Sequence, residues 1–154
     1  MKVRDLMDIH PVTLEPGMKY ADVMHVFNTH KISGAPVIGV EGDLLGIVSE
    51  KDLFRILYPF YKSYYMHPEQ YVDHEERENK AADIREHKVE VFMSNPVYTV
   101  HPDVPIMQAG AVMLSKKIHR LPVMDGRKLV GMIDRGAIFR AIMELNYGNV
   151  LKEK

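Results

Sequence analysis

The sequence GIVSEKD at residues 46–52 and the sequence KKIHRLPVMD at residues 116–125 decide the fold, because each has a counterpart elsewhere in the chain. HKISGAPVIG at residues 30–39 corresponds to the second stretch, and GMIDRGA at residues 131–137 corresponds to the first. Pro36 and Pro122 in these stretches are separated by 122 − 36 = 86 residues. Self-similarity at a fixed spacing predicts that the chain contains one structural unit twice.

The spacing of 86 holds along the front of the unit. It relates the pairs Val3/Val89, Met7/Met93, Thr13/Thr99, Pro16/Pro102, Val26/Val112, Lys31/Lys117, Ile32/Ile118 and Val37/Val123. Further along, the pairs Leu44/Leu129 and Gly46/Gly131 are separated by 85. A turn that is one residue shorter explains the change, because hairpin loops tolerate length differences while the strands beside them keep their register.

Composition narrows the class of function. The chain has 154 residues, 46% of them hydrophobic, which is enough for one compact core or two small ones. A net charge of −1 provides no basic field for nucleic acid or an anionic membrane surface, so we expect neither partner. The absence of cysteine excludes disulfides and thiolate chemistry. No apolar run approaches the ~20 residues of a membrane span, and we expect a cytoplasmic protein.

Each unit reads as β-α-β-β-α, which predicts an α/β fold. For the first unit we expect a helical turn at 3–7, a strand at 12–14, a helix at 19–30, a hairpin of strands at 35–40 and 44–48, and a helix starting at Ser49. The second unit repeats this order with a strand at 97–100, a helix at 104–116, strands at 121–124 and 128–133, and a helix from Asp134. The spacing in the helix at 19–30 predicts one buried face, formed by Tyr20, Val23, Met24 and Phe27.

The predicted domains are a first repeat at 1–66, a charged helical linker at 67–88 and a second repeat at 89–154. The sequence HEERENKAADIREHK at residues 74–88 is typical of a solvated linker helix. Aromatic side chains at helical spacing also favour association with a partner, although Pro59 would kink or restart such a helix. The residues at helical spacing are Tyr58, Tyr61 and Tyr65, and they belong to a cluster that also contains Tyr64 and Tyr71.

Ser49 and Asp52 have two possible roles. A carboxylate can accept both neighbouring hydroxyls of a ribose, and a serine at the start of a helix lies beside backbone N–H groups that favour phosphate or polar ribose atoms. The alternative is purely structural, because Ser-x-x-Asp at a helix start is also a capping box. Both roles predict the same local geometry.

The repeat resembles the CBS domain, a family whose members occur as tandem pairs, or Bateman modules, with two clefts between the repeats. The resemblance is carried by VRDLM at 3–7 and VEVFM at 89–93, by Thr-x-x-Pro at 13–16 and 99–102, by the two Pro-Val hairpins and by GIVSEKD. KKIHRLPVMD is similar to a segment of the nucleotide-sensing regulatory subunit of AMP-activated protein kinase. The family implies two repeats packed as one pseudo-twofold module.

The resemblance implies a first cleft in which the ribose carboxylate of one repeat works with the hairpin of the other. Arg120 and His119 would face phosphate groups, and Lys117 would add positive charge. The alternative for the first two is a strand edge whose charges discourage pairing. The implied nucleotide-binding residues are Ile47, Ser49, Asp52, Thr99, Val104, Ile118, His119, Arg120 and Pro122.

The implied second cleft departs from the family pattern. Ala137 stands where the ribose aspartate is expected, and Asp134 would place a negative charge near any phosphate. We therefore expect this cleft to bind a phosphorylated nucleotide poorly, and to hold an adenosine without phosphate or nothing. Its residues would be Thr13, Ile32, Ser33, Gly34, Pro36 and Asp134.

The resemblance favours a non-catalytic sensor that binds an adenine nucleotide, AMP, ADP or ATP, as a regulatory ligand and modulates an unidentified partner protein. It also implies a homodimer. We expect no required cofactor and no metal site, and an enzyme is the least favoured class because the sequence carries no catalytic constellation. The alternative function is a ligand-independent dimerisation or scaffold domain.

Overall fold

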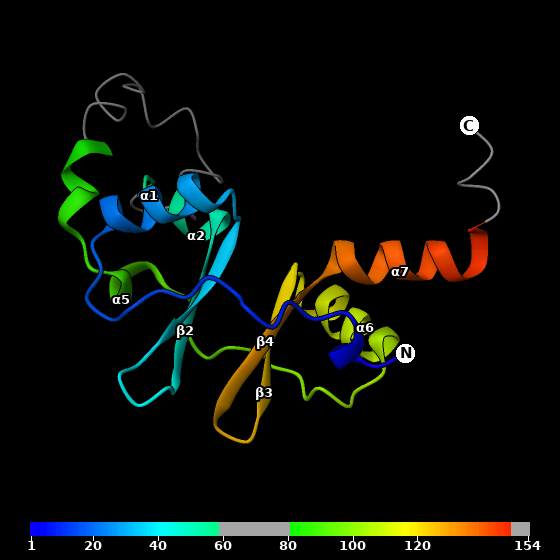
Figure 1. Cartoon of the computed structure of the whole chain (residues 1–154). Helices are drawn as coiled ribbons and strands as arrows, with labels where there is room; N and C mark the ends of the chain where they lie inside the picture. Colours follow the sequence, from blue (N-terminus) through cyan, green and yellow to red (C-terminus); the bar gives the residue numbers. More distant parts are fainter. Residues whose placement is uncertain (59–80, 149–154) are drawn as a thin grey trace. The chain divides into compact units, whose positions relative to one another are not determined.

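The computed structural model describes residues 1–58 and 81–148 (Figure 1). Helix, strand, strand, helix occur in this order twice, which confirms the α/β class and the repeat. The elements are η1 (Val3–Asp5), α1 (Tyr20–His30), β1 (Gly34–Ile38), β2 (Leu44–Ser49), α2 (Glu50–Arg55), η3 (Ala81–Glu86), α5 (Val89–Phe92), α6 (Ile106–Lys116), β3 (Arg120–Asp125), β4 (Lys128–Asp134) and α7 (Arg135–Tyr147).

The chain forms two compact units, and unit 1 combines the N-terminal segment with the second repeat. Unit 1 comprises Met1–Pro11, Gly42–Leu44 and Tyr98–Lys154, and unit 2 comprises Val12–Glu41 and Leu45–Val97. The N-terminal residues therefore complete the unit of the second repeat, and the residues around α5 complete the unit of the first. The predicted repeat boundaries at 1–66, 67–88 and 89–154 describe the sequence repeat and stay a prediction.

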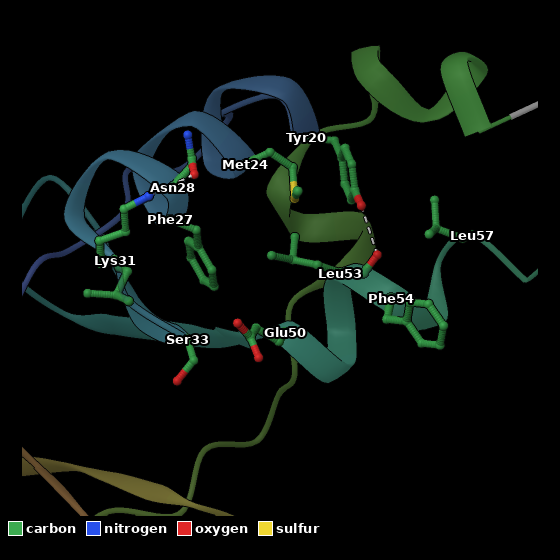
Figure 2. A pocket seen from close by; sticks show the side chains of 11 residues that line it. Tyr20, Met24, Phe27, Asn28, Lys31, Ser33, Glu50, Leu53, Phe54 and Leu57 are labelled. Carbon is green, nitrogen blue, oxygen red and sulfur yellow. Dashed lines mark hydrogen bonds between the residues drawn. The ribbon is translucent and has the colours of Figure 1, made fainter. Parts of the chain in front are cut away.

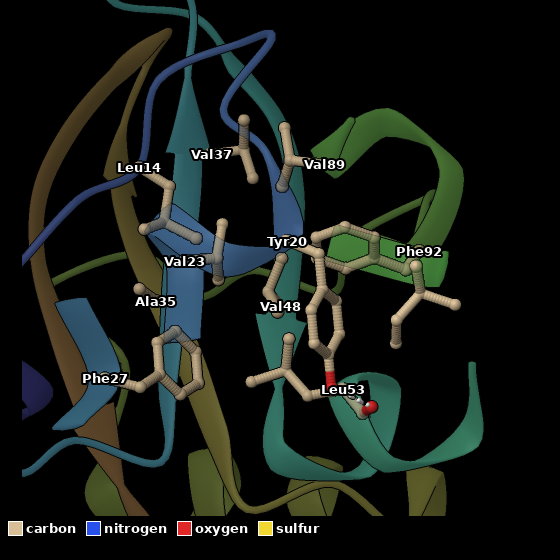
Figure 3. Packing of buried hydrophobic residues seen from close by; sticks show 11 residues of the cluster. Leu14, Tyr20, Val23, Phe27, Ala35, Val37, Val48, Leu53, Val89 and Phe92 are labelled. Atoms are coloured by element: carbon tan, nitrogen blue, oxygen red, sulfur yellow. Dashed lines mark hydrogen bonds between the residues drawn. The ribbon is translucent and has the colours of Figure 1, made fainter. Parts of the chain in front are cut away.

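In unit 2, α1 packs against the sheet formed by β1 and β2 (Figure 3). Tyr20, Val23 and Phe27 of α1 are buried, as their spacing predicts. Met24 was expected on the same buried face, and this prediction is wrong, because its side chain is 42% exposed. The buried cluster consists of Leu14, Tyr20, Val23, Phe27, Ala35, Val37, Val48, Leu53, Ile84, Val89 and Phe92.

The segment that precedes the second repeat closes this core. Val89 and Phe92 of α5 are buried, and the Phe92 ring meets the Tyr20 ring edge to face, with centroids 5.3 Å apart. Lys19 and Lys88 form a backbone bridge, and the Lys19 ammonium pairs with Glu86, whose hydrogen bond raises the pKa of Lys19. Unit 2 is therefore complete only once the chain has passed α5.

In unit 1, β3 and β4 pair antiparallel, and α6 and α7 pack with them. The core contains Val3 from the N-terminal segment, whose backbone N–H donates to the carbonyl of Val104 at 2.9 Å. Asp103 pairs with Lys2 and Arg4, and the hydrogen bond from Lys2 lowers the pKa of Asp103. The buried cluster is Val3, Val100, Ile106, Ala109, Met113, Leu121, Val123, Ile133 and Ile138.

Two predicted strands are shorter than expected. Within 12–14 and 97–100, single residues pair with a hairpin: Leu14 bridges Val37 and Val100 bridges Val123, both in parallel. A single pairing is too short to form a strand, but each of these two residues places a buried side chain in the core of its unit.

Part of the predicted tyrosine-rich and charged segment lies outside the described residues, namely Tyr61, Tyr64, Tyr65, Tyr71 and residues 74–80. Of the predicted linker helix, residues Ala81–Glu86 form the 3-10 helix η3.

Gly46 and Gly131 allow the second strand of each hairpin to lie close to a segment from elsewhere in the chain, which we call its bridging segment. Asp8 exchanges backbone hydrogen bonds with Met132 at 2.8 and 2.9 Å, and Ser94 does the same with Ile47 at 2.8 and 3.1 Å. A Cβ on Gly131 would lie 2.7 Å from the Asp8 carbonyl oxygen, whereas one on Gly46 would lie 2.6 Å from the Met93 sulfur. A Cβ at either position would force a neighbouring atom to shift, which accounts for the glycine in GIVSEKD and GMIDRGA.

We predict that Gly131→Ala lowers the free energy of unfolding by more than Gly46→Ala, within about 1–3 kcal/mol. The backbone oxygen of Asp8 must shift in the first variant, while the flexible end of Met93 gives way first in the second. Urea denaturation followed by circular dichroism measures both. Gly110→Ala is the control, because its Cβ would meet Ile138 at 3.9 Å and alanine suits a helix interior by about 0.5–1 kcal/mol. Equal losses in all three would contradict this explanation.

Candidate functional site

Among the described residues, Asp52 is the one charged residue that is buried, with 4% of its surface exposed. It lies in the first turn of α2, directly after β2. Its Oδ2 atom accepts from the backbone N–H of Ser49 at 2.8 Å and from Ser49 Oγ at 3.0 Å. Its Oδ1 atom accepts from Arg55 Nη2 at 2.8 Å and from Ser94 Oγ at 2.9 Å. Burial of this charge is stabilised by a cation and by hydroxyl and amide donors.

The structure confirms the capping box. Ser49 is the N-cap of α2, its hydroxyl receives a hydrogen bond from the Asp52 amide at 3.4 Å, and Asp52 returns to the Ser49 amide. The Ser49 amide is therefore already used by Asp52. The role of Asp52 toward a ribose stays a prediction, since the cap accounts for the local geometry by itself.

Ser94 and Arg55 were missed by the sequence analysis. Arg55 lies three residues after Asp52 on the same helix, a spacing that brings side chains together, so it could have been found. Ser94 is 42 residues away in sequence and follows α5. Its only signal in the sequence was its position directly after VEVFM, where a polar residue interrupts the apolar run.

In unit 1, Arg120 is the first residue of β3, and His119 directly precedes the strand. Arg120 lies opposite Asp134 in the β3–β4 register, so the two residues assigned to different clefts are direct cross-strand neighbours of opposite charge. Asp134 also caps α7, accepting the Ala137 amide at 2.8 Å. His119 is exposed, and its backbone carbonyl accepts a hydrogen bond from the Arg135 N–H at 2.9 Å. The residue directly across the hairpin from Arg120 therefore carries a negative charge.

The remaining predicted residues differ in burial and in their backbone contacts. Lys117 ends α6 in the left-handed conformation, with φ of 55°, and Lys31 ends α1 in the same way. The Ser33 carbonyl accepts a hydrogen bond from the Glu50 N–H at 3.1 Å, and this bond joins the segment after α1 to the start of α2. Thr13 and Thr99 are exposed; Ile32, Gly34, Ile47, Val104 and Ile118 are half-buried; Pro36 and Pro122 are buried.

The residues predicted for each cleft are divided between the two units. Ile47, Ser49 and Asp52 lie on consecutive elements of unit 2, whereas Thr99, Val104, Ile118, His119, Arg120 and Pro122 belong to unit 1. In the implied second cleft, Asp134 belongs to unit 1 and the other members belong to unit 2. The complete sets of both clefts stay predictions.

Unit 2 also contains a groove of about 670 Å³ between α1 and α2 (Figure 2). Lys31 and Ser33 lie at one end, and Tyr20 and Leu57 lie at the other. The Tyr20 hydroxyl donates to the Leu53 carbonyl at 2.8 Å, and burial raises the pKa of Tyr20. Of the second predicted cleft, only Ile32 and Ser33 line this groove.

Within residues 1–58 and 81–148, no three His, Asp or Glu side chains are grouped in a way that could hold a metal ion. No helix in the same ranges has the length and apolar character needed to cross a membrane.

Comparison of the sequence with known families and proteins gives matches over most of the chain. The sequence model of the CBS domain matches residues 3–59 and 85–144. Protein MJ1426 of Methanocaldococcus jannaschii is 30% identical over 155 residues, covering 93% of this chain and 92% of that protein. The A-adding tRNA nucleotidyltransferase of Aquifex aeolicus is 28% identical over 94% of this chain, which spans only 15% of that enzyme.

Solved structures agree with the fold. CBSX2 of Arabidopsis thaliana, solved in complex with AMP, gives a TM-score of 0.71 at 24% identity, covering 94% of this chain and 97% of CBSX2. The CBS domain pair of protein MJ0100, solved with 5′-methylthioadenosine and S-adenosyl-L-methionine, gives a TM-score of 0.71 at 21% identity, covering 95% and 98%. The paired-repeat fold is therefore shared with both.

We predict that Asp52→Asn lowers the free energy of unfolding by about 2–4 kcal/mol, because an amide nitrogen would face donors and leave Arg55 without its carboxylate. The matched control is Glu50→Gln, an exposed acid in the same helical turn, with an expected change within about 0.5 kcal/mol. Urea denaturation measures both. Similar small effects would show that the Asp52 contacts contribute little to the fold.

Proposed function

The chain belongs to the CBS domain family, and we propose on this premise that it is a non-catalytic regulatory module that binds an adenine nucleotide and modulates a partner protein. One observation carries the proposal. Asp52 is a buried carboxylate at the junction of β2 and α2, the position of the ribose-binding carboxylate in the family resemblance. The structural neighbours CBSX2 and MJ0100 support it, since both were solved with adenosine compounds.

In this proposal, Asp52 and Ser49 bind the ribose, and Arg120 and His119 bind the phosphate. The planar guanidinium of Arg120 can hold two phosphate oxygens at once, and His119 adds a donor when it is protonated. Ile47, Val104, Ile118 and Pro122 would contact the adenine, with Thr99 beside them. By the family resemblance, one ligand would be held by residues of both repeats.

The negative charge of Asp134 limits how many phosphates the site can hold. Asp134 lies directly across from Arg120, so the field that attracts a phosphate is partly offset by a neighbouring carboxylate. A ligand with few charges suits this arrangement better than one with many. We therefore propose AMP ahead of ADP and ATP.

The match with the A-adding tRNA nucleotidyltransferase does not lead us to propose an enzyme. This chain spans 15% of that protein. We propose that the chain itself has no catalytic role, and that any regulated activity belongs to a partner.

A second candidate function is homodimerisation, favoured by exposed apolar residues on two helices of unit 1. Met107 and Leu114 on α6 are 65% and 70% exposed, and Phe139 and Leu145 on α7 are 60% and 65% exposed. Met107 and Leu114 are seven residues apart and so share a helix face. Exposed apolar faces of this kind mark association surfaces. A scaffold that dimerises without ligand would need only this surface.

To test ligand binding, we expect calorimetric titration of adenosine, AMP, ADP, ATP and S-adenosylmethionine into ligand-free protein to show saturable binding of AMP. Arg120→Gln should weaken AMP binding roughly tenfold and leave adenosine unchanged, because the lost contact is a charge-assisted hydrogen bond to phosphate. Arg127→Gln in the exposed β3–β4 turn is the control. Absence of heat for every ligand would leave the scaffold as the function.

To test the association surface, we predict that Leu114→Glu and Phe139→Glu shift a dimer to monomer in sedimentation equilibrium, because a buried unpaired carboxylate opposes association. The matched control is Val40→Glu, which replaces a fully exposed apolar residue between β1 and β2 and should leave the dimer intact. A monomeric wild type, or a dimer that survives both helix variants, would rule out this surface.

A further inference from the structure

The acceptor positions of the Asp52 carboxylate are all occupied. Oδ1 receives Arg55 Nη2 and Ser94 Oγ at 2.8 and 2.9 Å, and Oδ2 receives Ser49 N and Ser49 Oγ at 2.8 and 3.0 Å. A carboxylate offers about four such positions. With 4% of its surface exposed, Asp52 can accept a ribose hydroxyl only if one of these donors leaves.

The donors differ in what their departure would cost. Both donors to Oδ2 come from Ser49 and form the cap of α2, so removing them leaves helix N–H groups without acceptors. Both donors to Oδ1 are side chains outside the cap. Arg55 is 41% exposed and can turn into water, and the Ser94 hydroxyl can turn by rotation about one bond. A ligand therefore gains access at Oδ1.

Ser94 can release Asp52 without disturbing the fold around it. Its backbone is held by two hydrogen bonds with Ile47, at 2.8 and 3.1 Å, and neither involves the hydroxyl. Because the main chain stays bridged to β2, only the side chain must move. Unlike Arg55, whose head lies near water, the half-buried Ser94 has a defined position directly against Oδ1.

We propose that the Ser94 hydroxyl competes with the ribose of the ligand for Oδ1 of Asp52, so that Ser94 sets the affinity of the site. This inference rests on the proposed function, because it requires Asp52 to bind the ribose. Ligand binding then exchanges the link between α2 and the segment after α5 for a link between α2 and the ligand. Ser94 is a positioning residue that holds the site closed when no ligand is bound.

The other repeat lacks this pair of a hydroxyl and a carboxylate at the equivalent positions. The residue equivalent to Ser94 is Asp8, at a spacing of 94 − 8 = 86, and the residue equivalent to Asp52 is Ala137, at a spacing of 137 − 52 = 85. The methyl group of Ala137 accepts no hydrogen bond, and Asp8 uses Oδ1 for the His10 amide at 2.9 Å. Competition for a carboxylate is thus confined to unit 2.

The test compares Ser94→Ala with the wild type by calorimetric titration of adenosine. Removing the competing hydroxyl should tighten adenosine binding roughly threefold to tenfold, the range that corresponds to one hydrogen bond. The probe 2′,3′-dideoxyadenosine lacks both ribose hydroxyls, so its affinity should be the same for the two proteins. Thermal denaturation of the ligand-free proteins should show Ser94→Ala to be the less stable one.

Ser94→Thr and Ser94→Val extend the test to a pair that is matched in shape and differs by the hydroxyl alone. The threonine variant should bind adenosine as the wild type does, and the valine variant should bind more tightly. These variants decide the question even if Ser94→Ala disturbs folding, because β-branched side chains suit the extended backbone of a residue that bridges to a strand.

Weaker or unchanged adenosine binding in both Ser94→Ala and Ser94→Val would overturn the inference while leaving the proposed function intact. An equal gain for dideoxyadenosine would also overturn it, because the ribose hydroxyls would then not be the competitors. Binding of adenosine by Ser94→Ala but not by the wild type would support it strongly. If no protein binds adenosine or AMP, the proposed function and this inference both fail.

Discussion

Each unit is stabilised internally by backbone hydrogen bonds that join the second strand of its hairpin to a segment that precedes the other repeat. Asp8 pairs with Met132 in unit 1, and Ser94 pairs with Ile47 in unit 2. The approach is so close that the strands carry glycine at Gly131 and Gly46. The side chains around these bridges, Val3 in one unit and Val89 with Phe92 in the other, then close the two cores.

The candidate site follows from the same constraint. Because Ser94 is fixed to Ile47 by its backbone, its hydroxyl is delivered to the carboxylate that begins α2. Asp52 thus caps its own helix, pairs with Arg55 and is tied to a distant segment. The other unit keeps the bridge but has Asp8 and Ala137 at the equivalent positions, so its negative charge sits on the bridging segment. One framework therefore places different chemical groups at equivalent positions of the two units.

Much of the fold could be predicted from sequence, because its signals are local or repeated. The spacing of apolar residues gave α1 and α6, and Ser49-x-x-Asp52 gave the start of α2. Local patterns do not tell which copy of a repeat a segment packs against, so they do not predict that residues 1–11 join the second repeat and that α5 joins the first. The Ser94–Asp52 contact was missed for the same reason, since it joins residues 42 positions apart. Met24 shows the limit of periodicity, which places a residue near the buried face but does not determine what covers it.

The exchange of segments also bears on the order in which the protein can form during its synthesis. Unit 2 has all its parts once Val97 has been made, whereas unit 1 joins the first eleven residues to a hairpin that ends at Asp134. Residues 1–11 precede unit 2 in the chain but must wait for a hairpin that follows it, and contacts over such long separations form slowly. Unit 1 is thus the second to be completed, and until then Val3 and its neighbours have no core of their own to join.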